Sequence, residues 1–273
     1  MKQSKETGKF EREYQINENF FKTIDTEEKA YILGFLYADG CNYVSKSGQK
    51  EIIAVQLEQD KDILEQIKTA TESTYPLYTE IQKENNKIKY IFRVTSSELS
   101  DDLYKLGVVY KKSLVLTFPD LSIFKSETLV RHFIRGVFDG DGCIWMGKPK
   151  YKECLNKKSG KIYTTLSFNT KFTFTGNIKF IEPLQDYLVD KIGLSKTKLN
   201  FSKAKNKNNT TSESVCTMEY SGRGNIKKLY DYMYKDSTIY GNRKKSKFEE
   251  IFCADSKKLL SESELSAESS LES

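Results

Sequence analysis

Histidine is nearly absent from the sequence: His132 is the only one in 273 residues. Zinc fingers with paired His, two-His metal sites and histidine-metal nucleases are therefore excluded for this chain. A Ser-His-Asp triad would depend on this one residue, and the sequence has no Gly-x-Ser-x-Gly elbow to support it. His132 lies within an apolar helical pattern, so we expect it to pack between elements.

Cysteine pairs and long apolar runs are also missing. The five cysteines show no Cys-x-x-Cys spacing, which favours reduced thiols in an intracellular protein. The first residues are polar and do not form a secretory signal, and no apolar run approaches the ~20 residues of a membrane helix. We expect an intracellular protein, cytoplasmic in a bacterium or phage or located in an organelle, with no membrane partner.

The charge that is present is basic and unevenly distributed. Lys and Arg number 44 against 38 Asp and Glu, a net charge of +6, and only six of the basic residues are Arg. The last twenty residues have a net charge of −3, which leaves +9 on the rest of the chain. A basic body rich in Tyr and Asn favours a polyanionic partner such as nucleic acid. A solvated lysine-rich surface would have the same composition.

One pattern occurs twice, 102 residues apart. Residues 27–39 and 127–141 each read as a helix, with Thr26 and Ser126 as the expected N-caps. Both helices end in Asp-Gly-Cys, at Asp39 and Asp141. A repeat of this length indicates a duplicated half of a domain, because solenoid repeats are shorter.

The elements that follow the two helices also correspond. Expected strands and helices are 50–58, 60–71, 87–94 and 98–106 in the first copy, and 164–175, 176–191, 196–202, 214–220 and 225–234 in the second. This predicts an α+β fold of two pseudo-symmetric αββαββα halves with antiparallel sheets. The expected segments are a polar N-terminal extension (1–23), a first half (24–113), a linker (114–126), a second half (127–253) and a disordered acidic tail (254–273).

Small residues recur at one face of both helices: Gly34 and Ala38 in the first, Gly136 and Gly140 in the second. Residues four apart share a helix face, so these positions would let the two backbones pack closely. A glycine inside a helix costs about 1 kcal/mol relative to Ala, which close packing would offset. Such packing brings the two helix C-termini, and their aspartates, together.

Two carboxylates at paired helix C-termini are electrostatically unfavourable. Each meets the negative end of a helix dipole, and the two repel each other. A hard divalent cation such as Mg²⁺ would relieve both penalties. In the simpler alternative each Asp-Gly only ends a helix. A calcium loop over residues 139–142 is a weaker alternative, because it lacks further acidic ligands.

The segments Ile32-Leu33-Gly34-Phe35-Leu36-Tyr37-Ala38-Asp39-Gly40 and Ile134-Arg135-Gly136-Val137-Phe138-Asp139-Gly140-Asp141-Gly142 resemble the paired motifs of LAGLIDADG homing endonucleases. The resemblance covers residues 24–253. It implies a monomer whose motif helices form the seam between the halves and whose sheets form a saddle over double-stranded DNA with a long, asymmetric target. The implied activity is site-specific, intron-homing type hydrolysis of DNA phosphodiesters with Mg²⁺, or another divalent cation such as Mn²⁺.

The resemblance also implies the site residues. The last acid of each motif, Asp39 and Asp141, would bind catalytic metal, with backbone carbonyls of Ala38 and Gly140. Asp139 would have a supporting role. The segments 106–119 and 229–245 resemble the family blocks that carry a basic active-site residue. Lys112 (with Lys111 second) and Lys244 (with Lys245 second) fit that position, although an ordinary solvated lysine is an equal alternative for each.

Alternation along the strands predicts the DNA-binding face. Its expected contacts are Lys87, Lys89, Arg93, Asn169, Lys171, Lys198 and Asn200. The basic stretches 148–158 and 203–209 are expected to be hairpin extensions or plain surface loops. An RNA maturase or a non-cleaving DNA-binding protein on the same fold remains the alternative function.

Overall fold

The structure is a computed structural model that describes residues 2–3, 10–11, 13–110, 112, 115–148, 150–156, 158–160, 162–201 and 215–254. The expected acidic tail, apart from its first residue, the second-choice Lys111 and the stretch 203–209 lie outside the described residues. No helix in the described ranges has the length and apolarity needed to cross a membrane. Two short strands near the N-terminus, β1 (Lys2–Gln3) and β2 (Phe10–Glu11), pair with each other.

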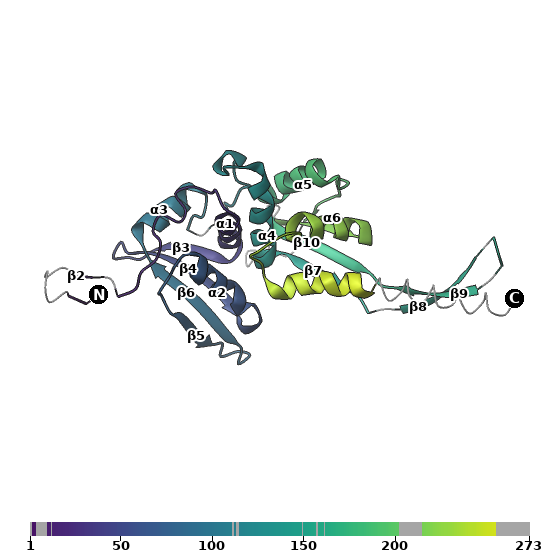
Figure 1. The fold of residues 1–273 in the computed structure, drawn as a ribbon, viewed down its shortest axis with the longest axis horizontal. Coiled ribbons are helices and arrows are strands. Elements are labelled where there is room, and N and C mark those ends of the chain that lie inside the picture. Colours follow the sequence, from purple (N-terminus) through teal and green to yellow (C-terminus); the bar gives the residue numbers. More distant parts are fainter. Residues whose placement is uncertain are drawn as a thin grey trace, which may run out of the picture.

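The first copy of the repeat folds as an antiparallel sheet covered by helices on one face (Figure 1). Its sheet has the strand order β3-β4-β6-β5. The elements are α1 (Glu27–Asp39), β3 (Gly40–Val44), β4 (Lys50–Leu57), η1 (Glu58–Asp60), α2 (Lys61–Ala70), β5 (Leu77–Ile81), β6 (Ile88–Thr95) and α3 (Ser97–Lys105). Thr26 caps α1 by accepting a hydrogen bond from the Lys29 amide at 3.3 Å, as the sequence predicts.

The second copy repeats this order around a sheet β11-β12-β10-β7. Its elements are η4 (Glu127–Leu129), α4 (Val130–Asp141), β7 (Cys143–Met146), β8 (Lys150–Leu155), β9 (Ile162–Ser167), β10 (Thr170–Asn177), α5 (Ile178–Ile192), β11 (Asn200–Phe201), β12 (Val215–Ser221) and α6 (Arg223–Tyr234). A further helix spans 242–254. The predicted α+β class and the αββαββα order of each half are confirmed, with β8–β9 and the last helix as additions.

Helices α1 and α4 pack side by side at the centre of the molecule, between the two sheets (Figure 1). A Cβ placed on Gly34 would lie 2.0 Å from the Phe133 carbonyl oxygen, and one on Gly136 would lie 2.0 Å from the Tyr31 carbonyl oxygen. These positions therefore admit no side chain, because the backbone of the partner helix occupies the space. The small residues of the two motifs allow this contact.

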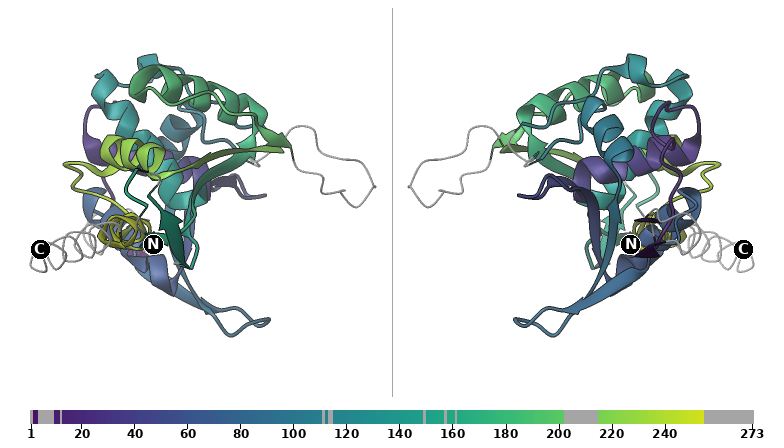
Figure 2. Two further views of the ribbon diagram at one scale, coloured as in Figure 1. Left: turned by 90° about the vertical axis from the view of Figure 1, so that its right-hand side faces the viewer. Right: turned by 90° about the vertical axis from the view of Figure 1, so that its left-hand side faces the viewer.

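Each large sheet has one face covered by helices and one face without a helix, as the end-on views show (Figure 2). Along β4, Ile52 and Ala54 are buried beneath the helices, whereas Val55 is 36% exposed. In β10, Phe172 and Phe174 are buried and alternate with accessible residues. We call the helix-free faces of the two large sheets the open faces.

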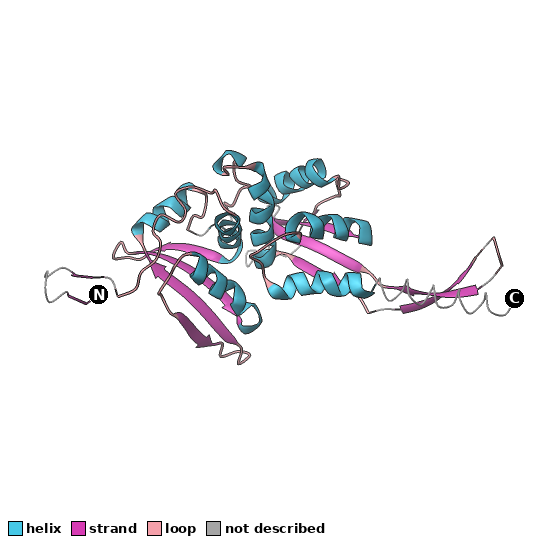
Figure 3. Cartoon of the chain, viewed as in Figure 1, coloured by secondary structure: helices cyan, strands magenta, loops and turns pink. Residues whose placement is uncertain are grey.

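The structure corrects two predicted strands. The expected strand 164–175 is two strands: β9 pairs only with β8, and β10 joins the large sheet. The break lies at 168–169, where the Asn169 carbonyl accepts the Gly147 amide at 2.8 Å and β7 ends. The β8–β9 hairpin projects from the body along the long axis (Figure 3). The expected strand 196–202 is reduced, among described residues, to β11, because Lys198 makes no ladder pair.

The N-terminal boundary is also corrected. Phe20 and Phe21, assigned from sequence to a polar extension, are 5% and 4% exposed and belong to the hydrophobic core. The Asn17 amide donates to the Thr71 carbonyl and the Thr74 amide to the Gln15 carbonyl, which fixes this segment on the first half. The expected linker returns to the same place: Phe124 pairs with Ile24, directly before α1.

Candidate functional site

The two motif aspartates meet at the end of the seam. A Cβ on Gly140 would lie 2.3 Å from the Ala38 Cβ and 3.4 Å from the Asp39 Oδ2, so the last turns of α1 and α4 are in contact. Each aspartate is followed by a glycine in extended conformation, Gly40 (φ −82°) and Gly142 (φ −74°), from which a strand departs. The chain therefore places both carboxylates where the two sheets begin.

The surroundings of these carboxylates oppose their ionisation. Burial raises the pKa of Asp39 above its usual range, and Asp60 adds to the effect, while a hydrogen bond from Gln56 and the two nearby lysines act against it. Burial and the charge of Asp39 raise the pKa of Asp141, although its side chain keeps contact with solvent. Mutual repulsion between the two aspartates is thus part of the site.

Two lysines cap the helix ends beside the aspartates. The Lys112 Nζ donates to the Ala38 carbonyl at 2.7 Å and to the Gly40 carbonyl at 2.5 Å. The Lys244 Nζ is buried and donates to the carbonyls of Phe138 (2.6 Å), Asp139 (2.9 Å) and Gly140 (2.9 Å). Each ammonium group therefore donates to carbonyl groups at the C-terminal end of a helix, although the Phe138 carbonyl also accepts the Gly142 amide at 2.9 Å.

These contacts alter the electrostatic balance expected from sequence. Neither α1 nor α4 has a basic residue in its last turn, and the lysines from other segments offset the negative helix ends instead. Burial lowers the pKa of both Lys112 and Lys244, while nearby aspartates act in the opposite direction. Even with both lysines present, burial keeps the pKa of Asp39 and of Asp141 raised, and the charge of Asp39 adds to the effect on Asp141; a divalent cation would relieve these penalties.

The structure also distinguishes Lys244 from its neighbour. The Lys245 Nζ lies 3.6 Å from the centre of the Tyr240 ring, so its ammonium group is engaged away from the aspartates. Of these two neighbours, Lys244 is the one whose charge acts on both Asp39 and Asp141, as that of Lys112 also does. The sequence alone could not choose between these adjacent residues, because only the helix phase of 242–254 decides which one points at the seam.

One motif position anchors the segment that carries the lysine in each half. In the second half it is Asp139, which is buried and accepts from the Gly241 amide at 2.6 Å, the Tyr234 hydroxyl at 2.5 Å and the Tyr31 hydroxyl at 2.9 Å. In the first half it is Tyr37, whose hydroxyl donates to the Leu106 carbonyl. Gly241 precedes Lys244 and Leu106 precedes Lys112, so both anchors act on the segments that position the lysines.

Gln56 is a site residue that sequence reasoning missed. Its Nε2 donates to the Asp39 Oδ2 at 2.5 Å from the second half of β4. Strand register places Gly176 at the equivalent position of the second copy, since Cys41 pairs with Ile53 and Cys143 with Thr173. Asp141 therefore lacks this amide partner, and the two halves of the site differ. A single Gln in a strand gives no sequence signal of this role.

His132 lies at the opposite end of α4, in a buried network that links the halves. The fully buried Arg135 contacts His132 Nδ1 (2.8 Å) and the Glu27 carboxylate (2.7 Å), and donates to the carbonyls of Met233 and Ile239. Burial, together with Arg135, lowers the pKa of His132 to about 4. The residue packs between elements, as expected from the sequence.

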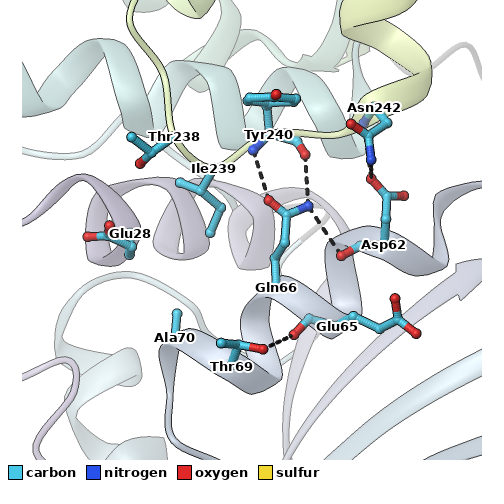
Figure 4. Close-up of a pocket in the computed structure, with 10 residues that line it drawn as sticks. All are labelled: Glu28, Asp62, Glu65, Gln66, Thr69, Ala70, Thr238, Ile239, Tyr240 and Asn242. Atoms are coloured by element: carbon cyan, nitrogen blue, oxygen red, sulfur yellow. Dashed lines mark hydrogen bonds between the residues drawn. The ribbon is translucent and has the colours of Figure 1, made fainter.

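Two further contacts join the halves on the helix-covered side. Arg243 donates to both carboxylate oxygens of the buried Asp60, at 2.8 and 2.9 Å. Gln66 holds the Tyr240 backbone through its amide, at 2.9 and 3.2 Å (Figure 4). The depression in that view, about 610 Å³, is lined mainly by α2 and residues 238–242. Glu28 lines it roughly 16 Å along α1 from Asp39, so it is a separate feature.

The predicted DNA-binding residues are accessible and fall into two groups. In the first half, Lys89 and Arg93 lie on the open face of β6, and Lys87 is in the loop before it. In the second half Lys171 lies on the open face of β10, where Glu219 pairs with it at 3.0 Å. The other three, all exposed, are Asn169 before β10, Lys198 before β11, and Asn200 in β11.

No group of three His, Cys, Asp or Glu side chains suited to a metal occurs within the described part of the chain. A metal between Asp39 and Asp141 would therefore use two carboxylates, with backbone carbonyls, water or substrate oxygens as the other ligands. That donor set fits Mg²⁺, which commonly binds through one or two carboxylates plus substrate phosphates. The Ala38 and Gly140 carbonyls keep a second acceptor position beyond their bonds to lysine.

No protein-family model matches the chain, and no curated protein matches it in sequence. Among solved structures, the I-LtrWI LAGLIDADG homing endonuclease bound to target DNA matches with a TM-score of 0.51 at 14% identity, covering 85% of this chain and 91% of the other. The LAGLIDADG meganuclease I-AabMI bound to uncleaved DNA gives 0.48 at 17% identity, covering 85% and 91%. With both motif helices at one seam, the chain has the two-motif fold of the LAGLIDADG homing endonucleases.

Proposed function

We propose that this chain is a site-specific endonuclease that cuts double-stranded DNA with the help of a divalent metal ion. The observation that supports it best is the convergence of Asp39 and Asp141 at the ends of two packed helices, where two antiparallel sheets begin. The I-LtrWI protein, which shares this fold, is a homing endonuclease bound to target DNA. Action as a monomer belongs to the same proposal, because one chain supplies both motifs. Intron homing belongs to it as the activity that the resemblance of the motifs implies.

Asp39 and Asp141 would hold the metal, together with the carbonyls of Ala38 and Gly140. Mg²⁺ is the expected ion, and Mn²⁺ could replace it. When bound, such an ion supplies a more acidic water molecule and neutralises charge on the phosphate. Two carboxylates whose ionisation is opposed by burial and, for Asp141, by the charge of Asp39 favour the cation, since its positive charge offsets both effects.

The protein's own side chains would orient the metal-binding carboxylates and compensate the negative charge at the site. Lys112 and Lys244 place ammonium groups beside the two carboxylates, where they would stabilise negative charge that develops on the phosphate. Gln56 fixes the Asp39 carboxylate in one orientation through its 2.5 Å hydrogen bond. His132 takes no part, because it is buried at the other end of α4.

The duplex would lie across the two open faces. Lys87, Lys89, Arg93, Lys171 and Lys198 are basic and accessible there, while Asn169 and Asn200 offer amides suited to base edges. The β8–β9 hairpin extends the second half along the long axis, and the first half has only a short turn between β3 and β4 at that place (Figure 1). A long, asymmetric target follows from these unequal halves. We expect the protein in the cytoplasm or in an organelle, where such DNA is present.

Removal of either carboxylate tests the proposal. In Asp39→Asn and Asp141→Asn we expect cleavage in Mg²⁺ to fall at least about a thousandfold, because metal-assisted hydrolysis depends on several kcal/mol of charge stabilisation. Binding of the duplex in EDTA should stay within a few fold of the unmodified protein. The measurement is selection of cleaved sites from a randomised plasmid library, followed by cleavage and binding assays on the recovered duplex.

Asp101→Asn is the matched control, because Asp101 is an exposed carboxylate whose partner is Lys50 on the helix side. It should cut normally. Normal cutting by either motif variant would contradict the two-carboxylate site. If the unmodified chain binds duplex DNA but cuts none of the library, the non-cleaving alternative replaces the nuclease; RNA-dependent splicing activity without cutting would identify a maturase.

A further inference from the structure

The open faces of the two sheets differ in chemistry although they are equivalent in register. On the first sheet, Val55, Ile91 and Tyr78 stand directly opposite one another across β4, β6 and β5. Ile53 and Leu57 lie on the same face of β4, two residues before and after Val55. We call these five residues the apolar patch. Val55 is 36% and Tyr78 47% exposed, so the patch is accessible in the protein alone.

The second sheet carries hydroxyl groups at the corresponding places. Thr173 is equivalent to Ile53 and Thr175 to Val55, because Cys41 pairs with Ile53 as Cys143 pairs with Thr173. The hydroxyls of Thr175 and Thr217 share a hydrogen bond of 2.8 Å across the sheet. The duplication thus has one apolar and one hydroxyl-bearing version of the same surface.

Two observations indicate that DNA covers the apolar patch. Lys89 stands opposite Leu57 and Arg93 opposite Ile53, so cationic side chains bracket the patch on β6. A depression of about 280 Å³ runs from Asp39 to Val55, Leu57, Lys87 and Lys89, which makes the patch continuous with the proposed site. A ligand on this patch therefore meets both the basic side chains and the motif carboxylate.

The chemistry of the major groove then specifies the sequence. Among the base edges of that groove, the C5-methyl group of thymine is the apolar one, and the other groups are hydrogen-bond donors or acceptors. Contact between Ile, Val or Leu side chains and a methyl group is favourable because both are apolar. A hydrogen-bond donor or acceptor of a base that is buried against these side chains is left unpaired, which is unfavourable. We infer that the first half recognises its half-site through thymine methyl groups, whereas the second half reads hydrogen-bonding groups. This inference depends on the proposed binding of duplex DNA.

Deoxyuridine isolates the methyl group, because it differs from thymidine only by that group. The probe is the duplex recovered from the randomised library, with the thymines of one half-site at a time replaced by deoxyuridine. Binding is measured in EDTA, where no cutting occurs. In the half-site that the first half of the chain contacts, we expect deoxyuridine to weaken binding by about fourfold for each buried methyl group that is removed. We call this the sensitive half-site. Deoxyuridine in the other half-site should change binding by less than about twofold.

Val55→Thr and its counterpart Thr175→Val complete the test, since both exchange a methyl group and a hydroxyl group at accessible, equivalent positions. Val55→Thr should reduce the preference for thymidine over deoxyuridine in the sensitive half-site. Thr175→Val should leave that preference intact and serves as the control. Both variants should keep the unfolding midpoint of the original chain, which shows that the fold is unaffected.

Several results would overturn the inference and leave the proposed nuclease standing: a recovered site without thymines in the sensitive half, equal binding of all deoxyuridine duplexes, or an unchanged preference in Val55→Thr. A dimer in sedimentation that Val55→Asp dissociates would also overturn it, because a second copy would then cover the patch. Failure to bind any duplex is a different outcome, since it contradicts the proposed function itself.

Discussion

Burial raises the pKa of both Asp39 and Asp141, and the charge of Asp39 raises that of Asp141 further, so ionisation of these groups costs stability. A carboxyl group whose pKa is higher in the folded than in the unfolded chain binds protons more readily when folded. Its destabilising effect is therefore fully present at pH values above the folded pKa. The effect fades as the pH falls toward the unfolded Asp value of about 3.9.

We accordingly expect Asp39→Asn and Asp141→Asn to raise the free energy of unfolding in EDTA at pH 7, with a smaller gain near pH 4. Mg²⁺ should raise the melting temperature of the unmodified protein, because a ligand that binds only the folded state stabilises it. Mg²⁺ should not raise the melting temperature of a variant that carries both substitutions. Urea unfolding at several pH values and thermal unfolding with and without Mg²⁺ measure both effects. Destabilisation by both single variants at pH 7 would contradict the electrostatic account.

The capping lysines give a second prediction at this scale. Lys244→Met keeps an unbranched side chain that is one atom shorter and removes the donor to three carbonyls at the end of α4. We expect a loss of about 1–3 kcal/mol in stability, because the carbonyls of Asp139 and Gly140 lose this buried donor while the Phe138 carbonyl keeps the Gly142 amide. We also expect a large loss of cleavage rate. The readouts are urea unfolding and single-turnover cleavage.

Lys245→Met is the matched control for that substitution. It removes a cation from the Tyr240 ring, a contact worth less than about 1 kcal/mol at an accessible site. It should leave cleavage nearly unchanged. A larger loss of cleavage rate in Lys245→Met than in Lys244→Met would identify Lys245 as the functional residue.

Among helices and strands, α1 and α4 show how far a local pattern predicts structure. Gly34, Ala38, Gly136 and Gly140 follow the helical period, so their shared face and the approach of the two Asp residues could be predicted from spacing alone. The partner of Asp39 could not, because Gln56 reaches it only through the register of β3 and β4. Contacts set by strand register or by folding of distant segments leave no periodic trace.

The same reasoning explains why the strand predicted over 164–175 and the N-terminal extension predicted over 1–23 differ from the structure. The alternation of polar and apolar residues continues through 168–169, although the chain leaves one sheet for another there. Its cause is the end of β7 at Met146, which is a property of the partner strand. Phe20 and Phe21 stand in a polar context, and their burial depends on the first half that they cover. Tertiary contact decided both features.

The helix seam gives the prediction at this scale. Gly34→Ala and Gly136→Ala should each lower the free energy of unfolding by about 3 kcal/mol or more, the upper range for overpacking, because the new Cβ meets partner backbone at 2.0 Å. Gly224→Ala in α6 is the control. A Cβ there meets nothing within 4 Å, so the helix should gain up to about 1 kcal/mol. Urea unfolding measures all three, and equal effects would contradict close packing at the seam.

The whole molecule presents basic side chains from both halves on its helix-free side. Five of the expected contacts are cationic: Lys87, Lys89, Arg93, Lys171 and Lys198. If each neutralises one phosphate, log K for duplex binding should fall against log salt with a slope of about −4.5. Fluorescence anisotropy between about 50 and 200 mM salt measures this slope. A flat response would contradict binding along the open faces.

The network of Glu27, Arg135 and His132 has a consequence for how such a molecule meets its ligand. Arg135 is fully buried and bonded to segments that belong to both copies of the repeat. Breaking a buried charged contact of this kind costs about 3–5 kcal/mol, so the two sheets do not part easily. The spacing of the two sheets is therefore fixed, and a duplex that lies across both of them must itself bend or untwist to fit. Deformable base steps at the middle of the target, which no side chain needs to touch, then become part of recognition.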